Sequence, residues 1–190
     1  MPATSEILLR ICAEKPKLDC NVLETVVMLA VEIAREGREG RKIGTLFAVG
    51  DTPAVLRHSK PMILDPLYGH PDEKKSVTSH DLRETIKELA QMDGAFVISD
   101  DGVAVSACRY LDASAEGISL TLGLGTRHVA AASISKSTKT VAVVVSESSI
   151  VRIFNNGELV WEIIPEIWMM RRYSIHLDEP ALERVADDVL

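Results

Sequence analysis

Residues 123–145 read GLGTRHVAAASISKSTKTVAVVV, and this stretch indicates the class of the fold. Its two glycines are typical of a loop, the alanine-rich part at 126–135 predicts a helix, and the valine-rich run at 140–145 predicts a buried strand. Three consecutive alanines at 130–132 would let that helix lie close to a neighbouring sheet. The stretch therefore predicts a helix that packs on a β-sheet.

Two hairpin signals flank this stretch. Apolar runs at 95–99 and 103–108 are joined by the sequence DDG, and runs at 150–154 and 158–163 are joined by the sequence NG. A further apolar run at 43–49 predicts another buried strand. Because some strands are joined by hairpins and others through helices, we expect an α/β fold with a mixed β-sheet flanked by helices on both faces, and a purely parallel doubly wound sheet is disfavoured.

Helix starts can be located from capping residues. The sequence NVLE at 21–24 has the form of a capping box, which predicts a helix from Asn21 to Gly37. A second helix is expected after a cap at Thr78 or Ser79. The segment 58–77 contains three prolines and a charged cluster, and we expect it to be a surface loop.

Composition limits the classes of function. The chain has 190 residues, of which 46% are hydrophobic and 26% charged, which is typical of a globular protein and excludes a disordered one. Its net charge of -7 excludes a basic field for non-specific binding to nucleic acid or to an anionic membrane. Any phosphate site must therefore be local.

The cysteines and the apolar segments indicate in which cellular compartment the protein is expected. Cys12, Cys20 and Cys108 lack the spacing of a zinc cluster, and their odd, small number favours a reducing cytoplasm over a disulfide framework. The N-terminal apolar segments are interrupted by charges, so we expect neither a secretion signal nor a membrane span. One domain over 18–165 is expected, between an N-terminal segment at 1–17 and a helical tail at 166–190 with Pro180 in the first turn of a helix.

Three short motifs contain residues that could bind a ligand or take part in catalysis. Gly125-Thr126-Arg127-His128 opens a predicted helix, where N–H groups, a hydroxyl and a guanidinium could surround a phosphate, although an ordinary helix cap fits the same residues. Asp93 begins a D-G-A motif that could present a carboxylate to a hydroxyl or a metal, or could form a plain turn. The sequence SES after the strand at 140–145 lies where sheets collect ligands, or is a turn.

Taken together and in this order, the motifs resemble those of the diadenylate cyclase family. That family has a D-G-A motif, a G-T-R-H-R motif that opens a helix followed by A-A and I-S, and a V-S-E-E turn before a closing hairpin. The present sequence has matching residues at 93–95, 125–128, 130–131, 134–135 and 145–147. Residues 44–47, 50–51 and 65–66 also look like the first half of the family, so the resemblance covers about 18–165.

The resemblance implies an activity and roles for particular residues. The activity is the condensation of two ATP molecules into cyclic di-AMP with release of two pyrophosphates, using Mn²⁺ or Mg²⁺, in a homo-oligomer whose active sites face each other. It implies catalytic roles for Asp93, Arg127 and His128 and metal binding by Asp93 and Glu147. The residues implied in ATP binding are Gly94, Ala95, Tyr110, Leu111, Gly125, Thr126, Arg127, His128 and Ser146.

Two positions depart from the family pattern. Val129 stands where the family has its second arginine, whose role would be absent or taken by Arg109, Lys136 or a partner chain. Ser148 replaces the second glutamate of V-S-E-E. These departures support an alternative hypothesis, a nucleotide-binding sensor that does not cyclise ATP. A purely structural domain would leave the clustering of Asp93 with Arg127 unexplained.

Overall fold

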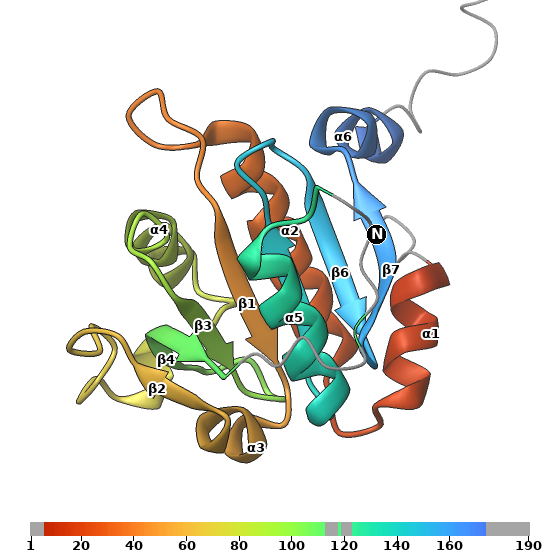
Figure 1. Ribbon diagram of the computed structural model, residues 1–190. Coiled ribbons are helices and arrows are strands. Elements are labelled where there is room, and N and C mark those ends of the chain that lie inside the picture. Colours follow the sequence, from red (N-terminus) through yellow and green to blue (C-terminus); the bar gives the residue numbers. More distant parts are fainter. Residues whose placement is uncertain (1–5, 113–117, 119–122, 174–190) are drawn as a thin grey trace, which may run out of the picture.

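The computed structural model describes residues 6–112, 118 and 123–173. Within these residues seven strands form a single sheet, and six α-helices and a short 3₁₀ helix surround it (Figure 1). The strands are β1 (Thr45–Val49), β2 (Ser59–Pro61), β3 (Ala95–Ile98), β4 (Ala104–Leu111), β5 (Val141–Val145), β6 (Val151–Asn155) and β7 (Glu158–Ile163). The helices are α1 (Glu6–Glu14), α2 (Cys20–Glu36), α3 (Thr52–Arg57), the 3₁₀ helix η1 (Asp72–Lys74), α4 (His80–Leu89), α5 (Thr126–Ser137) and α6 (Pro165–Tyr173).

The sheet is mixed, as the sequence predicts. Its order is β2-β4-β3-β1-β5-β6-β7, and among the described strands only β1 and β3 pair in parallel. Both predicted hairpins are present, as β3–β4 and β6–β7. The structure thus confirms an α/β fold with a mixed sheet.

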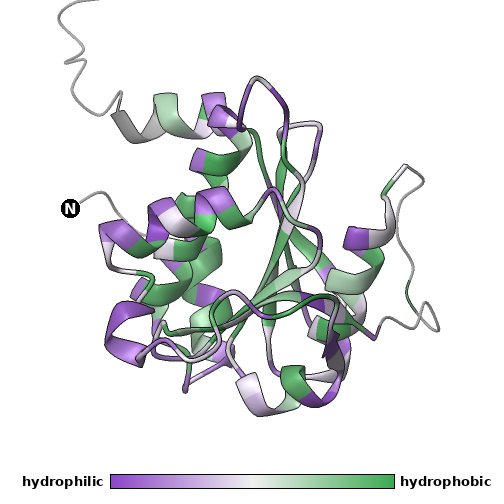
Figure 2. Ribbon diagram, turned by 90° about the vertical axis from the view of Figure 1, so that its left-hand side faces the viewer, coloured by the Kyte–Doolittle hydropathy of each residue, from purple (hydrophilic) through white to green (hydrophobic). Residues whose placement is uncertain are grey.

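Helices cover both faces of the sheet, and two hydrophobic clusters fill the space between. One cluster joins α1, α2 and α4 to the sheet, with Phe47 and Phe96 stacked at its centre. The other joins α3 and α5 to the opposite face, where Ala131 and Ala132 are fully buried. In Figure 2 the strands at the centre are mainly hydrophobic, which agrees with this layered core.

Several local predictions need correction. Helix α2 is capped by Asp19, which accepts a hydrogen bond from the Asn21 N–H at 2.8 Å, so the helix begins before the predicted cap at Asn21. The predicted cap at Ser79 and the helix end at Gly37 are confirmed. Segment 58–77 is not entirely loop, because β2 pairs with β4. The helix expected at Pro180 lies outside the described residues.

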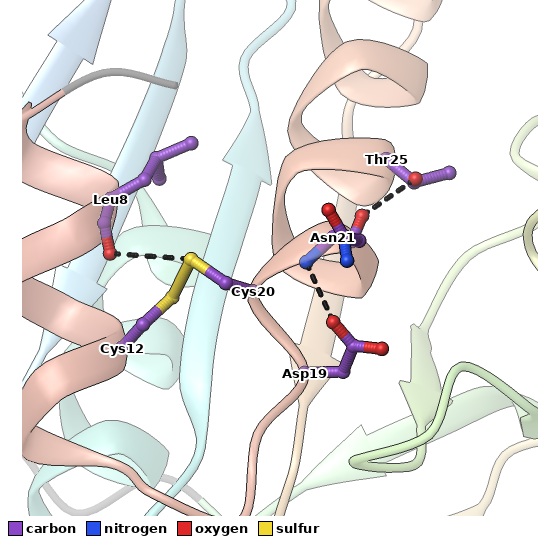
Figure 3. Close-up of a disulfide and its surroundings, with 6 residues drawn as sticks. All are labelled: Leu8, Cys12, Asp19, Cys20, Asn21 and Thr25. Carbon is purple, nitrogen blue, oxygen red and sulfur yellow. Dashed lines mark hydrogen bonds between the residues drawn. A yellow bond between two sulfur atoms is a disulfide. The ribbon is translucent and has the colours of Figure 1, made fainter. Parts of the chain in front are cut away.

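The expectation of unpaired cysteines is wrong at two positions. Cys12 in α1 and Cys20 at the start of α2 form a disulfide (Figure 3), with their Cα atoms 5.7 Å apart. The short connection between the two helices brings these cysteines together, a tertiary effect that cysteine counting does not detect. Cys108 is free and buried. None of the helices in the described part of the chain is long and apolar enough to cross a membrane.

The strand directions bring several chain segments to one edge of the sheet. Because β1 and β3 are parallel, both begin at this edge. Strands β4 and β5 run antiparallel to their neighbours, so both end there: Arg109 pairs with Ala95, and Val145 pairs with Thr45. The segments before β1 and β3 and those after β4 and β5 therefore lie close together.

Gly94, just before β3, illustrates how tightly this edge is packed. Its φ is +105°, and a Cβ atom there would lie 2.6 Å from the backbone carbonyl carbon of Cys108. The contacted atoms belong to the backbone of β4, which cannot move aside without disturbing the sheet. Glycine is therefore required at this position by both conformation and space.

We predict that Gly94→Ala lowers the free energy of unfolding by at least about 3 kcal/mol, combining backbone strain with overpacking. Gly69→Ala is the matched control, because Gly69 also has a positive φ, of +80°, but nothing lies within 4 Å of its added Cβ. The control should lose only about 1 to 2 kcal/mol. Urea denaturation measures both, and equal losses in the two variants would refute the backbone contact.

Candidate functional site

A cavity of about 590 Å³ opens at this edge of the sheet, lined mainly by the segment that leads into β3, the end of β4 and the start of α5. Its size is within the range of small-molecule sites. The wall includes Asp93, which the resemblance implies in catalysis and metal binding. It also includes most of the residues implied in ATP binding, namely Gly94, Ala95, Tyr110, Leu111, Gly125, Thr126 and Arg127. The tertiary structure therefore brings together residues that are up to 34 positions apart in the sequence.

Arg127, in the first turn of α5, contacts two carboxylates from different parts of the sheet edge. Its Nη2 lies 3.5 Å from Oδ1 of Asp93, and its Nη1 lies 3.1 Å from Oε1 of Glu147. Asp93 precedes β3 and Glu147 follows β5. The two carboxylate side chains are about 70% exposed, so these ion pairs add little to stability. Their exposure leaves all three charged groups accessible to a ligand.

The beginning of α5 forms another part of the cavity wall. The helix starts after Gly125, and the described residues provide no side-chain cap for its first N–H groups. Such groups, together with the positive end of the helix dipole, favour an anion. Thr126 adds a hydroxyl to the cavity wall at this point.

The wall formed by β4 is partly apolar. Tyr110 is 48% exposed, and the Nζ of Lys60 lies 5.2 Å from the centre of its ring. Leu111 is buried beside it, and Met62 comes from the loop after β2. A flat aromatic ring with apolar neighbours suits a planar base.

Two residues that the site prediction did not include hold this wall in place. Arg109 donates hydrogen bonds from Nε to the Ser59 hydroxyl at 2.7 Å and from Nη2 to the Ser59 carbonyl at 2.9 Å. Asp65 accepts from the Ser106 hydroxyl at 2.6 Å and from the Ala107 N–H at 3.2 Å. The only sequence signal for Asp65 is the D-P pair, and its partners lie about 40 residues away.

The structure does not bring all of the predicted residues to the cavity wall. His128 is buried with only 7% of its surface exposed, and its ring contacts Phe154 edge to face. Its Nε2 lies 3.2 Å from Nη1 of Arg152 and accepts the hydrogen bond, because a guanidinium can only donate. Ser146 also lies outside the wall, with its hydroxyl 2.6 Å from that of Ser148.

The structure shows the surroundings of position 129, where the family motif has its second arginine. Val129 itself lines the cavity, so an apolar side chain occupies this part of the wall. Arg109 lines the cavity too, but its guanidinium donates to Ser59 and to the Leu56 carbonyl. Lys136 is near the other end of α5, beside Gly157 of the β6–β7 turn. Neither residue is placed as a substitute for an arginine at position 129.

The sequence and the fold match known proteins. The family model described as DisA bacterial checkpoint controller nucleotide-binding matches residues 32–159. A protein named diadenylate cyclase from Methanocaldococcus jannaschii is 49% identical over 144 residues, which are 75% of this chain and 45% of that protein. Another of that name from Haloferax volcanii is 41% identical over 155 residues, which are 80% of this chain and 56% of that protein. The chain thus spans about half the length of these curated relatives.

Solved structures share the fold. A double mutant of DacA from Staphylococcus aureus superimposes with a TM-score of 0.53 at 22% identity, covering 80% of this chain and 95% of that one. A hypothetical membrane spanning protein from Bacillus cereus gives 0.54 at 18% identity, covering 74% of this chain and 62% of that one. At these identities the likeness concerns the fold alone.

The environment of His128 generates a prediction about pH. Burial, then Arg152 and Arg127, lower the pKa of His128 below its ordinary value of 6.5, whereas the Gly125 carbonyl and Glu162 oppose this shift. Below about pH 6.5 the unfolded chain therefore binds more protons at this residue than the folded chain, and stability falls as the pH falls.

We predict that His128→Gln makes the loss of stability between pH 7.5 and 5.5 smaller than in the wild type, as measured by urea denaturation at both values. His80→Gln, which removes an exposed histidine at the start of α4, is the control and should keep the wild-type difference. If His128→Gln also keeps that difference, the buried neutral state of His128 is disproved.

Proposed function

Because the chain belongs to the DisA bacterial checkpoint controller nucleotide-binding family, we propose that it is a diadenylate cyclase. Such an enzyme condenses two ATP molecules into cyclic di-AMP and releases two pyrophosphates. The observation that best supports the proposal is the contact of Arg127 with both Asp93 and Glu147 at the start of α5, for which the described residues provide no side-chain cap. We also propose the cytoplasm as its location, since that is where ATP is supplied.

The cavity wall suggests how ATP is bound. Tyr110 and Leu111 contact the adenine, and the backbone at Gly94 and Ala95 lies beside the ribose. The triphosphate lies at the start of α5, where Arg127 and the first-turn N–H groups supply positive charge. Such positioning matters because phosphoryl transfer depends on orientation and charge neutralisation more than on covalent chemistry.

The reaction needs a group that helps to remove a proton from a ribose hydroxyl. We assign Asp93 to this task, because its carboxylate is exposed at the cavity wall beside the proposed ribose position. The 3′ oxygen then forms a bond to the α-phosphorus of the second ATP while the bond from that phosphorus to the pyrophosphate oxygen breaks. Arg127 stabilises the negative charge on the phosphates during this transfer.

Asp93 and Glu147 also fit the expected Mn²⁺ or Mg²⁺. Their carboxylate oxygens are the hard ligands that these ions prefer, and Mg²⁺ commonly uses one or two carboxylates together with phosphate oxygens. The described residues contain no group of three or more His, Cys, Asp or Glu that could hold a metal without substrate. We therefore propose that Asp93 and Glu147 hold the ion jointly with the nucleotide. When bound, such an ion would lower the pKa of the hydroxyl and neutralise phosphate charge.

In this proposal His128 and Ser146 do not contact the phosphates but position residues that bind the nucleotide or the metal. His128 fixes the orientation of α5 through its contact with Arg152 of β6. Ser146 shapes the turn that carries Glu147, because its hydroxyl accepts a hydrogen bond from the Ser148 N–H at 3.0 Å. Both would affect phosphate binding through the residues that they position.

Two protomers are needed for the complete reaction. One cavity of about 590 Å³ suits a single nucleotide. A product with two equivalent halves is made most simply across a twofold axis, so we propose a homo-oligomer whose active sites face each other in pairs. Each protomer then supplies one ATP.

A nucleotide sensor is the second candidate. It is favoured by Val129, which places an apolar side chain in the cavity wall where the family motif has an arginine. Such a protein would bind ATP at the same residues without joining two molecules. Product analysis distinguishes the two functions.

We predict that purified protein forms cyclic di-AMP from ATP with Mn²⁺ or Mg²⁺, as detected by mass spectrometry. Asp93→Asn should abolish the product but change the ATP dissociation constant by less than about tenfold, or about 1.4 kcal/mol. Asp81→Asn, which alters a fully exposed carboxylate on α4, should keep wild-type activity. Binding of ATP without product at any divalent metal would favour the sensor, and full activity of Asp93→Asn would remove Asp93 from catalysis.

We predict that an excess of Asp93→Asn protomers suppresses cyclic product more strongly than simple dilution does. A mixed pair has one working site, so it would form one phosphodiester bond and release a linear dinucleotide. The assay measures cyclic and linear products in mixtures of the two proteins, after subunit exchange has been verified with labelled chains. If cyclic product remains proportional to the wild-type fraction, the two-protomer mechanism is incorrect.

A further inference from the structure

Gly44, immediately before β1, lies against the guanidinium of Arg127. A Cβ atom at Gly44 would be 2.5 Å from Nη1 and 3.1 Å from Cζ of Arg127, and 3.2 Å from Cγ of Glu147. Non-bonded carbon and nitrogen atoms do not approach this closely. Arg127 therefore occupies its present position only because residue 44 lacks a side chain.

The place of β1 in the sheet explains this contact. Strand β1 lies between β3 and β5, so its first residues lie between the segment that carries Asp93 and the turn that carries Glu147. To contact both carboxylates, the guanidinium of Arg127 must cross the start of β1. A small residue at position 44 leaves room for that crossing.

The conformation of Gly44 does not itself require glycine. Its φ lies outside the left-handed region, unlike that of Gly94. The atoms that an added methyl would displace also differ, because at Gly94 they belong to the backbone and at Gly44 the nearest is the end of a flexible side chain. An alanine at position 44 should thus leave the fold intact and move Arg127.

We propose that Gly44 is a positioning residue for phosphate recognition, which acts by seating Arg127 between Asp93 and Glu147. This inference rests on the proposed function, because it gives the guanidinium the task of holding the triphosphate. It adds a residue outside the cavity wall to the machinery of the site. Its effect should pass mainly through Arg127, because the other close contact of an added methyl, with Cγ of Glu147 at 3.2 Å, is looser than that with the guanidinium.

A double-mutant cycle with 3′-deoxy-ATP and Mn²⁺ tests the proposal, because this nucleotide lacks the attacking hydroxyl and reports binding alone. We expect Gly44→Ala to weaken binding about tenfold and Arg127→Ala to weaken it about 10- to 100-fold. The double variant should bind nearly as Arg127→Ala does, since only the looser contact of the methyl with Glu147 then remains. Additive losses, or wild-type affinity of Gly44→Ala, would overturn the proposal.

A second measurement does not depend on ligand binding. The Nε–Hε NMR signal of Arg127, assigned by its loss in Arg127→Lys, should shift in Gly44→Ala while the melting temperature and the amide spectrum of the core stay unchanged. An unshifted signal would contradict the seating role even if no nucleotide binds. Absence of cyclic di-AMP from the wild type would instead refute the cyclase and leave this result intact.

Discussion

The guanidinium of Arg127 joins three segments that are far apart in the sequence, through its contacts with Asp93 and Glu147. Exposed ion pairs of this kind contribute little to folding, so the sheet beneath them must hold the three residues in place. It does so because β1 and β3 begin at the edge where β5 ends. As a result this edge of the sheet is crowded. Glycine at position 44 leaves room for the Arg127 side chain, whereas glycine at position 94 is required by the backbone of β4 and by its own positive φ.

Buried and hydrogen-bonded elements surround this exposed contact. Strand β5 is buried throughout, and α5 lies on it through small side chains such as Ala131 and Ala132. On the other side of the cavity, Asp65 and Arg109 tie the loop and edge strand to β4. Asp93, Arg127 and Glu147, whose charged groups would contact a ligand, thus lie on or beside elements that are held in place by burial and hydrogen bonds.

Local sequence signals predicted those parts of the fold that local chemistry determines. The DDG and NG turns specified both hairpins, and the glycine before Thr126 marked the start of α5. Features that depend on distant partners were missed. The hydrogen bonds of Asp65 and Arg109 join residues about 40 to 50 positions apart, which neither the D-P pair nor the position of Arg109 on a strand reveals. The Cys12–Cys20 disulfide depends on how two helices meet, and the burial of His128 follows from its contacts with β6.

The central claim is that Arg127 and the start of α5 hold the phosphates of ATP. A crystal structure with 3′-deoxy-ATP and Mn²⁺ tests it most directly. The account predicts phosphate oxygens within hydrogen-bond distance of Arg127 and of the first-turn N–H groups of α5, with the adenine against Tyr110. A nucleotide bound elsewhere, or one bound in the cavity with no phosphate near Arg127, would contradict it.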